Sequence, residues 1–332
     1  MKLRSRITGT GSATPEKILT NKELESLVET SDEWIRRRTG IEERRISIKD
    51  KDESTTALAT EASLKAMDMA GVAPEDIGMI VVATVTPDRQ FPAASCMIQK
   101  ELGAQNAAAF DISAGCSGFV YGLSIVDNAI KCGAIKKALV VGVERLSTIV
   151  NWKDRGTCVL LGDGAGAVVV EATKKDEGIL SSHIRSDGTF GDLLYTSYGN
   201  DYVPEILEGI DKKPFLMIME GNKVFKIAVN CLSAISREAL EYNNLSDKDI
   251  ALLIPHQANL RIIEATAKSL DIPMERVYTN VQKYGNTSSA SIPIALDEVH
   301  RAGKLKKGDN ILLVAFGAGF TWGSSIIKWA LD

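Results

Sequence analysis

Hydrophobic residues cluster in short runs that are apolar at every position. Five such runs, rich in valine, isoleucine and leucine, lie at 79–83, 138–141, 167–170, 251–254 and 311–314. A strand that is apolar on both faces is typical of a sheet covered by helices on each side. The runs therefore predict buried strands in a protein of the α/β class.

Segments with helical spacing of apolar residues lie between these runs, and their ends carry capping signals. Ser31 is placed to begin one helix that Gly40 would end. Ser54 or Thr55 would begin another, with Gly71 as its end. Serine and threonine satisfy free N–H groups at a helix start, and glycine adopts the left-handed conformation that ends a helix. This alternation of strands and helices supports the α/β prediction.

A weak internal repeat relates the two halves of the chain. Three pairs of similar positions share an offset of 173 residues: Asp76 with Asp249, Leu139 with Leu312, and Cys116 with Ser289. The shared offset predicts a duplicated chain with halves at 1–172 and 173–332. Because no proline-rich or serine-rich linker separates the halves, we expect them to fold as one body.

Composition excludes several classes of protein. The 332 residues are 45% hydrophobic and 25% charged, with a net charge of 39 − 43 = −4, so the chain has no global signature of nucleic-acid or anionic-membrane binding. No apolar run approaches the roughly 20 residues that cross a bilayer, and the basic segment 1–6 lacks the apolar core of a signal peptide. Five scattered cysteines without a CxxC pair favour neither a zinc site nor a disulfide framework. We expect a cytoplasmic protein without a bound metal.

Cys116 is the strongest candidate for chemistry. Segment 108–119 predicts a strand, a turn of small residues and then a helix, which places Cys116 at a helix N-terminus. There the helix dipole favours the thiolate, so we expect a lowered pKa and a nucleophilic sulfur. The alternative is a small buried cysteine of structural importance only.

Three further segments could complete a site around Cys116. His256 follows a predicted buried strand, whereas His183 and His300 are expected at the surface. Segment 281–291 resembles the Cys116 turn in its small residues, although, taken alone, a polar loop that caps the next helix explains it better. Segment 316–323 follows a strand and could offer backbone N–H groups to an oxyanion.

Together these segments resemble β-ketoacyl-acyl-carrier-protein synthase III, the initiating condensing enzymes of bacterial type II fatty-acid synthesis. The similarity covers nearly the whole chain, and its motifs lie in order at 31–41, 108–119, 154–157, 220–226, 255–259, 284–288 and 317–323. The resemblance implies a thiolase-like fold, which is an internally duplicated five-layer α/β/α/β/α arrangement that assembles as a homodimer.

The resemblance also implies a catalytic triad of Cys116, His256 and Asn286. Cys116 would take the acyl group from an acyl-CoA primer, acetyl-CoA by default, with the backbone N–H groups of Cys116 and Ala318 as the oxyanion hole. Malonyl-acyl-carrier protein would then lose CO2, and its enolate would be held by His256 and Asn286 before it attacks the acyl-cysteine. The product would be 3-oxoacyl-acyl-carrier protein, and no cofactor is implied.

Contacts with substrates and with a second subunit are carried over in the same way. Coenzyme A would be held at the adenine by Trp34 and Arg155, at the phosphates by Arg38, and along its pantetheine arm by Asn222 and Phe225. Phe91 would close the acyl pocket of the partner subunit. The acidic carrier protein would dock on a basic patch formed by Lys226, Arg261 and Lys268.

Other functions remain open from the residues alone. A related condensing enzyme could use another acceptor or make a secondary metabolite, and a cysteine hydrolase could cleave a thioester with the same triad. A thiolase is disfavoured because no second catalytic cysteine follows Cys231. A coenzyme A-binding protein without activity would have an unreactive Cys116.

Overall fold

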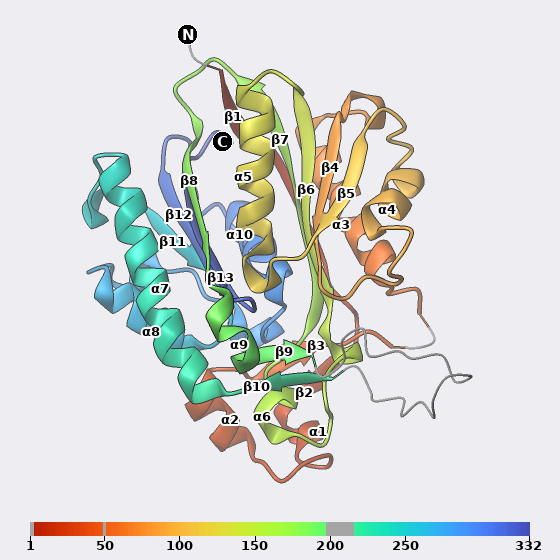
Figure 1. Cartoon of the computed structure of the whole chain (residues 1–332), viewed down its shortest axis with the longest axis vertical. Helices are drawn as coiled ribbons and strands as arrows, with labels where there is room; N and C mark the ends of the chain where they lie inside the picture. Colours follow the sequence, from red (N-terminus) through yellow and green to blue (C-terminus); the bar gives the residue numbers. More distant parts are fainter. Residues whose placement is uncertain (1–2, 49–50, 197–215) are drawn as a thin grey trace.

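Two β-sheets organise the chain in the computed structural model, which describes residues 3–48, 51–196 and 216–332 (Figure 1). The first sheet has the order β1-β7-β6-β4-β5 and the second the order β11-β12-β13-β8. The strands of the first sheet are β1 (Arg4–Ala13), β4 (Met79–Ala83), β5 (Ala108–Ile112), β6 (Lys137–Arg145) and β7 (Asp163–Thr173). Those of the second are β8 (Gly178–Ser186), β11 (Leu252–Pro255), β12 (Asn310–Gly317) and β13 (Thr321–Lys328).

Both sheets mix parallel and antiparallel pairs. In the first sheet β4 runs parallel to β5 and β6, while β7 is antiparallel to both β6 and β1. In the second sheet β11 is parallel to β12, and β13 is antiparallel to β12 and β8. Two small antiparallel pairs lie outside these sheets: β2 (Ile18–Thr20) with β3 (Glu43–Arg45), and β9 (Leu194–Thr196) with β10 (Met217–Met219).

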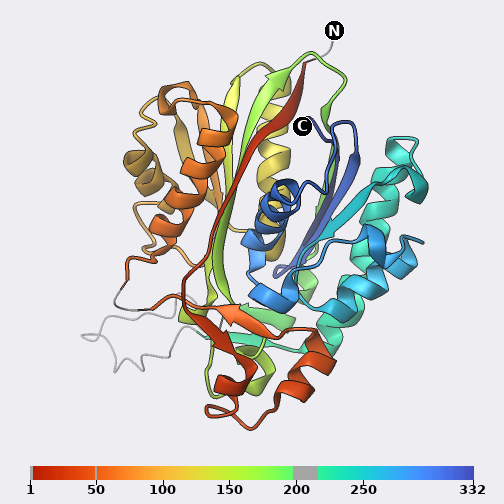
Figure 2. The same cartoon turned by 180° about the vertical axis from the view of Figure 1, so that it is seen from behind.

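Helices cover the outer faces of both sheets and fill the space between them (Figures 1 and 2). One outer layer holds α3 (Thr55–Ala70) and α4 (Ala94–Leu102), the middle layer α5 (Gly118–Lys131) and α10 (Ser291–Arg301), and the other outer layer α7 (Gly221–Tyr242) and α8 (Leu260–Ser269). Three large apolar cores lie between the layers: one beneath α3 and α4, one around α5 and α10 between the two sheets, and one beneath α7 and α8. Ile80, Val81 and Leu312 are fully buried examples from the three. The five-layer α/β/α/β/α prediction is confirmed.

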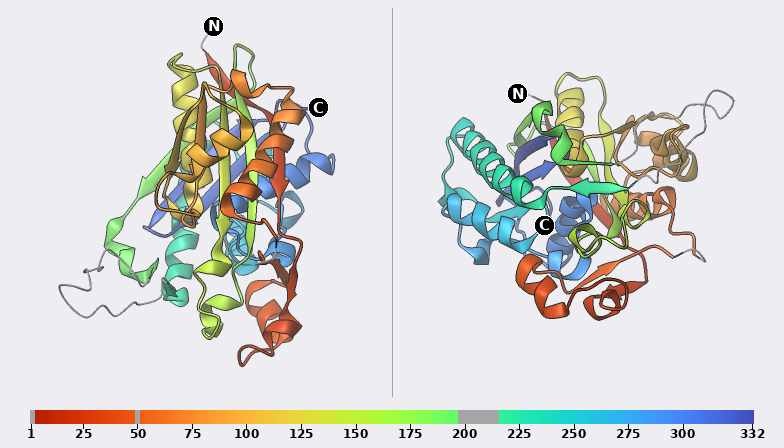
Figure 3. Two further views of the ribbon diagram at one scale, coloured as in Figure 1. Left: turned by 90° about the vertical axis from the view of Figure 1, so that its right-hand side faces the viewer. Right: turned by 60° about the horizontal axis from the view of Figure 1, so that its bottom comes forward.

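Short helices and turns connect the layers, and those of segments 21–39 and 155–158 lie together at one end of the molecule (Figure 3). The short α-helices are α1 (Asn21–Leu24), α2 (Asp32–Thr39), α6 (Arg155–Cys158) and α9 (Val281–Tyr284). The 3₁₀ turns are η1 (Pro74–Asp76), η2 (Gly115–Ser117), η3 (Leu146–Thr148), η4 (Gly188–Leu193), η5 (Asp247–Asp249), η6 (Met274–Arg276) and η7 (Ser288–Ala290).

The offset of 173 residues recurs in the bounds of these elements. It separates the starts of η1 and η5, of η2 and η7, of α5 and α10, and of β6 and β12. The division of the chain at residues 172 and 173 itself stays a prediction, although it falls close to the end of β7 at Thr173.

Local sequence signals account for most element boundaries. All five predicted strands are present, and only the run at 251–254 is displaced by one residue, as β11. The Ser31 side chain accepts from the Trp34 N–H, and Gly40 ends α2 with φ of 77°. Ser54 begins α3 and Gly71 ends it. Within the described ranges, no helix has the length and apolar character that a bilayer crossing requires.

Candidate active site

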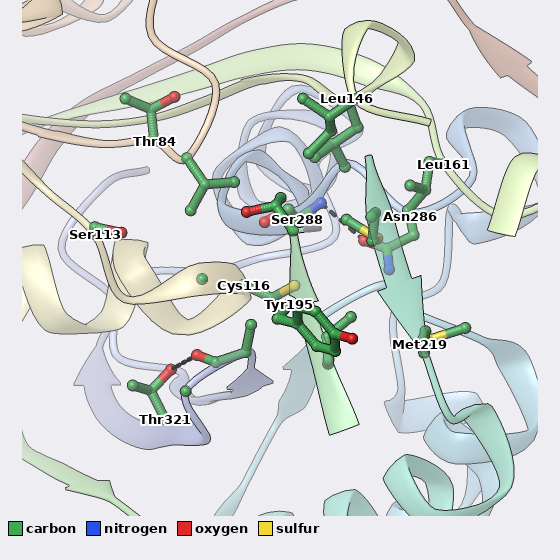
Figure 4. A pocket seen from close by; sticks show the side chains of 18 of the residues that line it. Thr84, Ser113, Cys116, Leu146, Leu161, Tyr195, Met219, Asn286, Ser288 and Thr321 are labelled. Atoms are coloured by element: carbon green, nitrogen blue, oxygen red, sulfur yellow. Dashed lines mark hydrogen bonds between the residues drawn. The ribbon is translucent and has the colours of Figure 1, made fainter. Parts of the chain in front are cut away.

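A cavity of about 660 Å³ lies at the C-terminal ends of β4, β5 and β12 (Figure 4). It is lined by side chains from both halves of the chain, among them Thr84, Ser113, Cys116, Leu146, Tyr195, Met219, Asn286, Ser288, Ala318 and Thr321. Its wall is mainly apolar, with polar groups at a few positions, which is typical of a pocket for an organic substrate. Two of the three triad candidates, Cys116 and Asn286, meet in this cavity.

Cys116 lies in η2, immediately before α5, and its turn packs tightly on the turn after β12. Gly115 has φ of 51°, a conformation that favours glycine. A Cβ atom on Gly317 would lie 2.3 Å from the Cys116 nitrogen, so only glycine fits there. A Cβ on Gly115 would lie 2.8 Å from the nitrogen of Ala318, and Ala318 is not among the described residues with positive φ. The backbone N–H groups of Cys116 and Ala318 are thereby held on adjacent turns.

The resting Cys116 thiol is protonated, contrary to the sequence expectation. Burial raises its pKa to about 11, because a thiolate loses its hydration in the cavity wall. Hydrogen bonding from the Ser288 side chain lowers the pKa, but by less than burial raises it, and the nearby Glu144 raises it further. A lowered pKa was therefore the wrong prediction, since desolvation exceeds the favourable effect of the helix N-terminus.

His256 follows β11 directly and is buried. Its backbone N–H donates to the Val314 carbonyl at 2.8 Å, which fixes it beside β12. Ser291 accepts from the Gln257 N–H at 3.3 Å, and its oxygen lies 2.7 Å from His256 Nδ1. The direction of this bond depends on the ring tautomer: when the Ser291 hydroxyl donates to Nδ1, the proton of the neutral ring is on Nε2.

Burial also sets the charge of His256. It lowers the pKa of the imidazole to about 3, so the ring is neutral at neutral pH. His256 is not among the described residues that line the cavity. It lies just after the end of β11, the strand next to β12. In this state the imidazole is a hydrogen-bond donor and a weak base.

Asn286 is fixed by three hydrogen bonds. Its backbone N–H donates to the Leu160 carbonyl at 2.8 Å, and its carbonyl accepts from the Gly162 N–H at 3.0 Å. The backbone N–H of Ser288 donates to Oδ1 at 2.8 Å, drawn as a dashed line in Figure 4. Because Oδ1 is occupied, the Nδ2 amide group is the part of Asn286 that is free to donate to a ligand.

Glu144 is a buried carboxyl group that sequence reasoning missed. It is the eighth residue of β6 and 0% exposed. Its Oε2 accepts from Thr86 Oγ1 at 2.6 Å and from the Val85 N–H at 3.1 Å, and Oε1 accepts from Ser288 and Ser289. Burial raises its pKa to about 7. The only sequence signal was an acidic residue at the end of an apolar strand.

Comparison with known proteins agrees with this geometry. Two family models match, described as 3-oxoacyl-[acyl-carrier-protein (ACP)] synthase III over residues 110–188 and as its C-terminal domain over residues 240–329. A β-ketoacyl-[acyl-carrier-protein] synthase III of Caldanaerobacter subterraneus subsp. tengcongensis is 55% identical over 329 residues, 99% of each chain. The chain belongs to the 3-oxoacyl-[acyl-carrier-protein] synthase III family. It is a condensing acyltransferase of fatty-acid synthesis.

Further relatives support the same assignment. The synthase III of Thioalkalivibrio sulfidiphilus is 52% identical over 326 residues, which cover 98% of this chain and 99% of the relative. The crystal structure of 3-oxoacyl-[acyl-carrier-protein] synthase III from Aquifex aeolicus superposes with a TM-score of 0.91 at 46% identity, over 98% of this chain and 100% of that one. The thiolase-like fold is therefore confirmed.

The residues expected to hold the coenzyme A nucleotide lie close together on the short helices α2 and α6. Trp34 and Arg38 are on α2, and Arg155 begins α6. The Arg155 guanidinium carbon lies 4.7 Å from the Trp34 ring centroid, and that of Arg38 lies 5.7 Å away. These are cation–π distances, so the three side chains form one cluster.

The expected pantetheine and docking residues lie on two neighbouring helices. Asn222, Phe225 and Lys226 are in the first turns of α7, and Arg261 and Lys268 are on α8. The Arg261 guanidinium carbon lies 5.5 Å from the Phe225 ring centroid, which joins the two helices. Asn222 and Phe225 are not among the described residues that line the cavity.

Three other predictions concern single side chains. Phe91 is 86% exposed, in the loop between β4 and α4 that also carries the cavity residue Gln90. His183 is not a surface residue, because it bonds Glu238 and Ser181 and its side chain is only 10% exposed. His300 is also partly buried, against the Trp329 ring. In the described ranges, no cluster of three potential metal ligands occurs.

Proposed function

We propose that this synthase III joins an acetyl group from acetyl-CoA to malonyl-acyl-carrier protein through a thioester on Cys116. The supporting observation is the cavity in which the Cys116 thiol, the Asn286 amide and the turn of Ala318 converge. Covalent catalysis of this kind divides one difficult condensation into two easier steps.

In the first step the Cys116 sulfur attacks the carbonyl carbon of the acyl-CoA. A tetrahedral oxyanion develops at that carbonyl, and the N–H groups of Cys116 and Ala318 are the donors that would stabilise it. Collapse of the intermediate releases coenzyme A and leaves acyl-Cys116. Because the thiol is protonated at rest, attack requires that its proton be removed.

In the second step malonyl-acyl-carrier protein loses CO2 and forms an enolate. The enolate oxygen carries negative charge, which neutral hydrogen-bond donors can stabilise. His256 supplies Nε2–H in the tautomer in which Ser291 donates to Nδ1, and Asn286 supplies Nδ2–H because the Ser288 N–H occupies Oδ1. The enolate carbon then attacks the acyl thioester and releases the Cys116 sulfur.

Coenzyme A recognition by Trp34 and Arg155 requires a rearrangement of this pair. An adenine between the indole and the guanidinium needs about 7 Å, which is two van der Waals separations, whereas they lie 4.7 Å apart here. Arg155 is also bonded to the Glu29 carbonyl at 2.9 Å. We therefore expect the nucleotide to displace Arg155 from its resting contact, with Arg38 available for the phosphates.

Carrier-protein docking and dimer formation complete the proposal. Exposed Lys226, Arg261 and Lys268 supply positive charge for an acidic carrier protein. Exposed Phe91 would be buried in a homodimer, where it would reach the acyl pocket of the second subunit. A cytoplasmic location and a reaction without a cofactor remain parts of the proposal.

The proposal is tested by following acetyl-CoA with wild-type protein and with Cys116→Ser. The wild type should gain one acetyl group on Cys116, and the variant should gain none because serine is a poor nucleophile without a strong base. An acetylated Cys116→Ser protein would place the nucleophile elsewhere. Steady release of coenzyme A without an adduct or a carrier-protein substrate would instead indicate a hydrolase.

A further inference from the structure

The first step above leaves open where the proton of Cys116 goes. His256 is poorly suited to accept it, because its pKa of about 3 makes it a weak base. The buried carboxyl group of Glu144 has a pKa of about 7. Glu144 is therefore the stronger base of these two buried groups.

Ser288 connects Glu144 to the thiol. Its hydroxyl donates to Glu144 Oε1 at 3.2 Å, and its side chain also interacts with the Cys116 thiol, whose pKa it lowers. Ser288 and Cys116 both line the cavity, and both are drawn in Figure 4. A hydroxyl group can accept one proton and donate its own, so it can pass a proton between two groups that do not touch.

The other partners of Glu144 hold the carboxyl group in place without competing for this proton. Thr84, Thr86 and the Val85 N–H occupy Oε2, while Ser289 shares Oε1 at 3.1 Å. All are neutral donors on the loop after β4 or on η7. Glu144 forms no ion pair within the described residues.

Charged and titratable groups on the neighbouring elements are engaged elsewhere. Arg145, the next residue in β6, lies 3.7 Å from Asp88. Asp163 on β7 accepts from Ser47 and Ser147. Of the titratable groups around Glu144, the thiol of Cys116 is the one coupled to it through Ser288 and through its charge.

We propose that Glu144 accepts the Cys116 proton through Ser288 during acylation, stores it while the acyl-enzyme exists, and returns it after condensation. The inference rests on the proposed function, because it assigns the proton of that same acylation step. Glu144 acts on Cys116 through Ser288 and does not touch the substrate, so it is a positioning residue rather than a catalytic one.

The proton balance of the cycle closes with this assignment. In acylation the S–H bond breaks, the proton passes to Glu144, the C–S bond to Cys116 forms, and coenzyme A leaves as a thiolate that takes a proton from solvent. Decarboxylation supplies the carbon nucleophile, which breaks the acyl–Cys116 bond. The released Cys116 thiolate then recovers the proton from Glu144, so that overall one solvent proton ends on coenzyme A.

A stored proton also serves the second step. A malonyl carboxylate and then an enolate must occupy the cavity, and an ionised Glu144 behind Ser288 would repel both. In the acyl-enzyme Glu144 is neutral and this repulsion is absent. The acyl group also displaces water from the cavity, which further favours the neutral carboxyl form.

The test is proton uptake during acylation, measured with an indicator dye in weakly buffered solution at about pH 7.5, where an ordinary thiol of pKa about 8.5 is protonated. Enzyme is mixed with acetyl-CoA alone, and acetylation is counted by intact-protein mass. Wild type should take up roughly three-quarters of a proton for each acetyl group gained, because Glu144 with a pKa of about 7 is about three-quarters ionised at this pH. Glu144→Gln should take up none, because its thiol proton passes to coenzyme A directly.

Two further variants separate proton storage from a structural effect. Ser288→Ala should slow acetylation at least about tenfold yet keep the wild-type proton uptake per acetyl group. The substitution removes the hydroxyl that passes the proton but leaves the Glu144 carboxyl group that holds it. Ser289→Ala removes a donor to Glu144 but not the path, so uptake should remain and its pH midpoint should move upward. Acetylated wild type without proton uptake, or equal uptake by Glu144→Gln, would overturn the proposal.

Alkylation with iodoacetamide tests the same store without any acyl-CoA. Subtracting the signal of Cys116→Ser removes the contribution of the other four cysteines. Alkylation of Cys116 should then release about one proton in the Glu144→Gln background and roughly a quarter of a proton in the wild type, in which ionised Glu144 takes up the rest. If acetylation fails but the two proteins differ in proton release, the proposed function is wrong and Glu144 still accepts the Cys116 proton. If the two proteins release the same number of protons, the role proposed for Glu144 is refuted.

Discussion

Replacing Glu144 by glutamine should stabilise the folded protein at alkaline pH more than at acidic pH. Burial holds the pKa of Glu144 at about 7, against an ordinary value of 4.5. The neutral carboxyl group therefore favours folding fully below pH 4.5, and this contribution is lost as the pH rises through 7. The shift of 7 − 4.5 = 2.5 units corresponds to about 3 kcal/mol, of which about 2.5 kcal/mol falls between pH 5 and pH 8.

Equilibrium urea unfolding, followed by tryptophan fluorescence, measures this effect. Wild type and Glu144→Gln are compared at one protein concentration across pH 5 to pH 8, because association would shift both curves. Glutamine keeps the size of the side chain and one acceptor oxygen but does not titrate, and His256 contributes equally to both proteins. A free-energy difference between the two that is constant within about 0.5 kcal/mol across this range would refute the raised pKa.

Three other substitutions test separate parts of the site. Asn286→Ala should leave acetylation of Cys116 within about threefold of wild type but reduce condensation by about 10²-fold or more, as seen by single-turnover kinetics of each step. Gly317→Ala should impair acetylation itself, because its Cβ would meet the Cys116 nitrogen at 2.3 Å and push the oxyanion turns apart. Arg261→Glu should raise KM for malonyl-carrier protein several-fold while acetylation by acetyl-CoA is unchanged; an equal loss in both would assign Arg261 to coenzyme A binding.

Features set by short stretches of sequence were predictable. The caps at Ser31 and Gly40 and the strand at 79–83 depend on neighbouring residues and on burial of both sheet faces. The strand–turn–helix setting of Cys116 was visible for the same reason. The five-layer arrangement and the triad came from the resemblance of ordered motifs rather than from any one segment.

Properties that depend on distant residues were not predictable from the sequence. The Cys116 pKa was expected to fall because only the local helix could be seen, whereas the burial that raises it comes from the whole cavity wall. Glu144 was missed because its hydrogen-bond donors lie 58 to 145 residues away, on the loop after β4 and on η7. The Arg155 contact with Trp34 likewise joins two segments far apart in the chain.

The most direct test of covalent condensation is the intact mass of the protein after acetyl-CoA and again after malonyl-acyl-carrier protein. The account predicts one acetyl group on Cys116 that disappears when the malonyl carrier is added, with 3-oxoacyl-carrier protein formed in equal amount. An acetyl group that persists in the presence of the malonyl carrier, or a condensation product formed by Cys116→Ser, would contradict it.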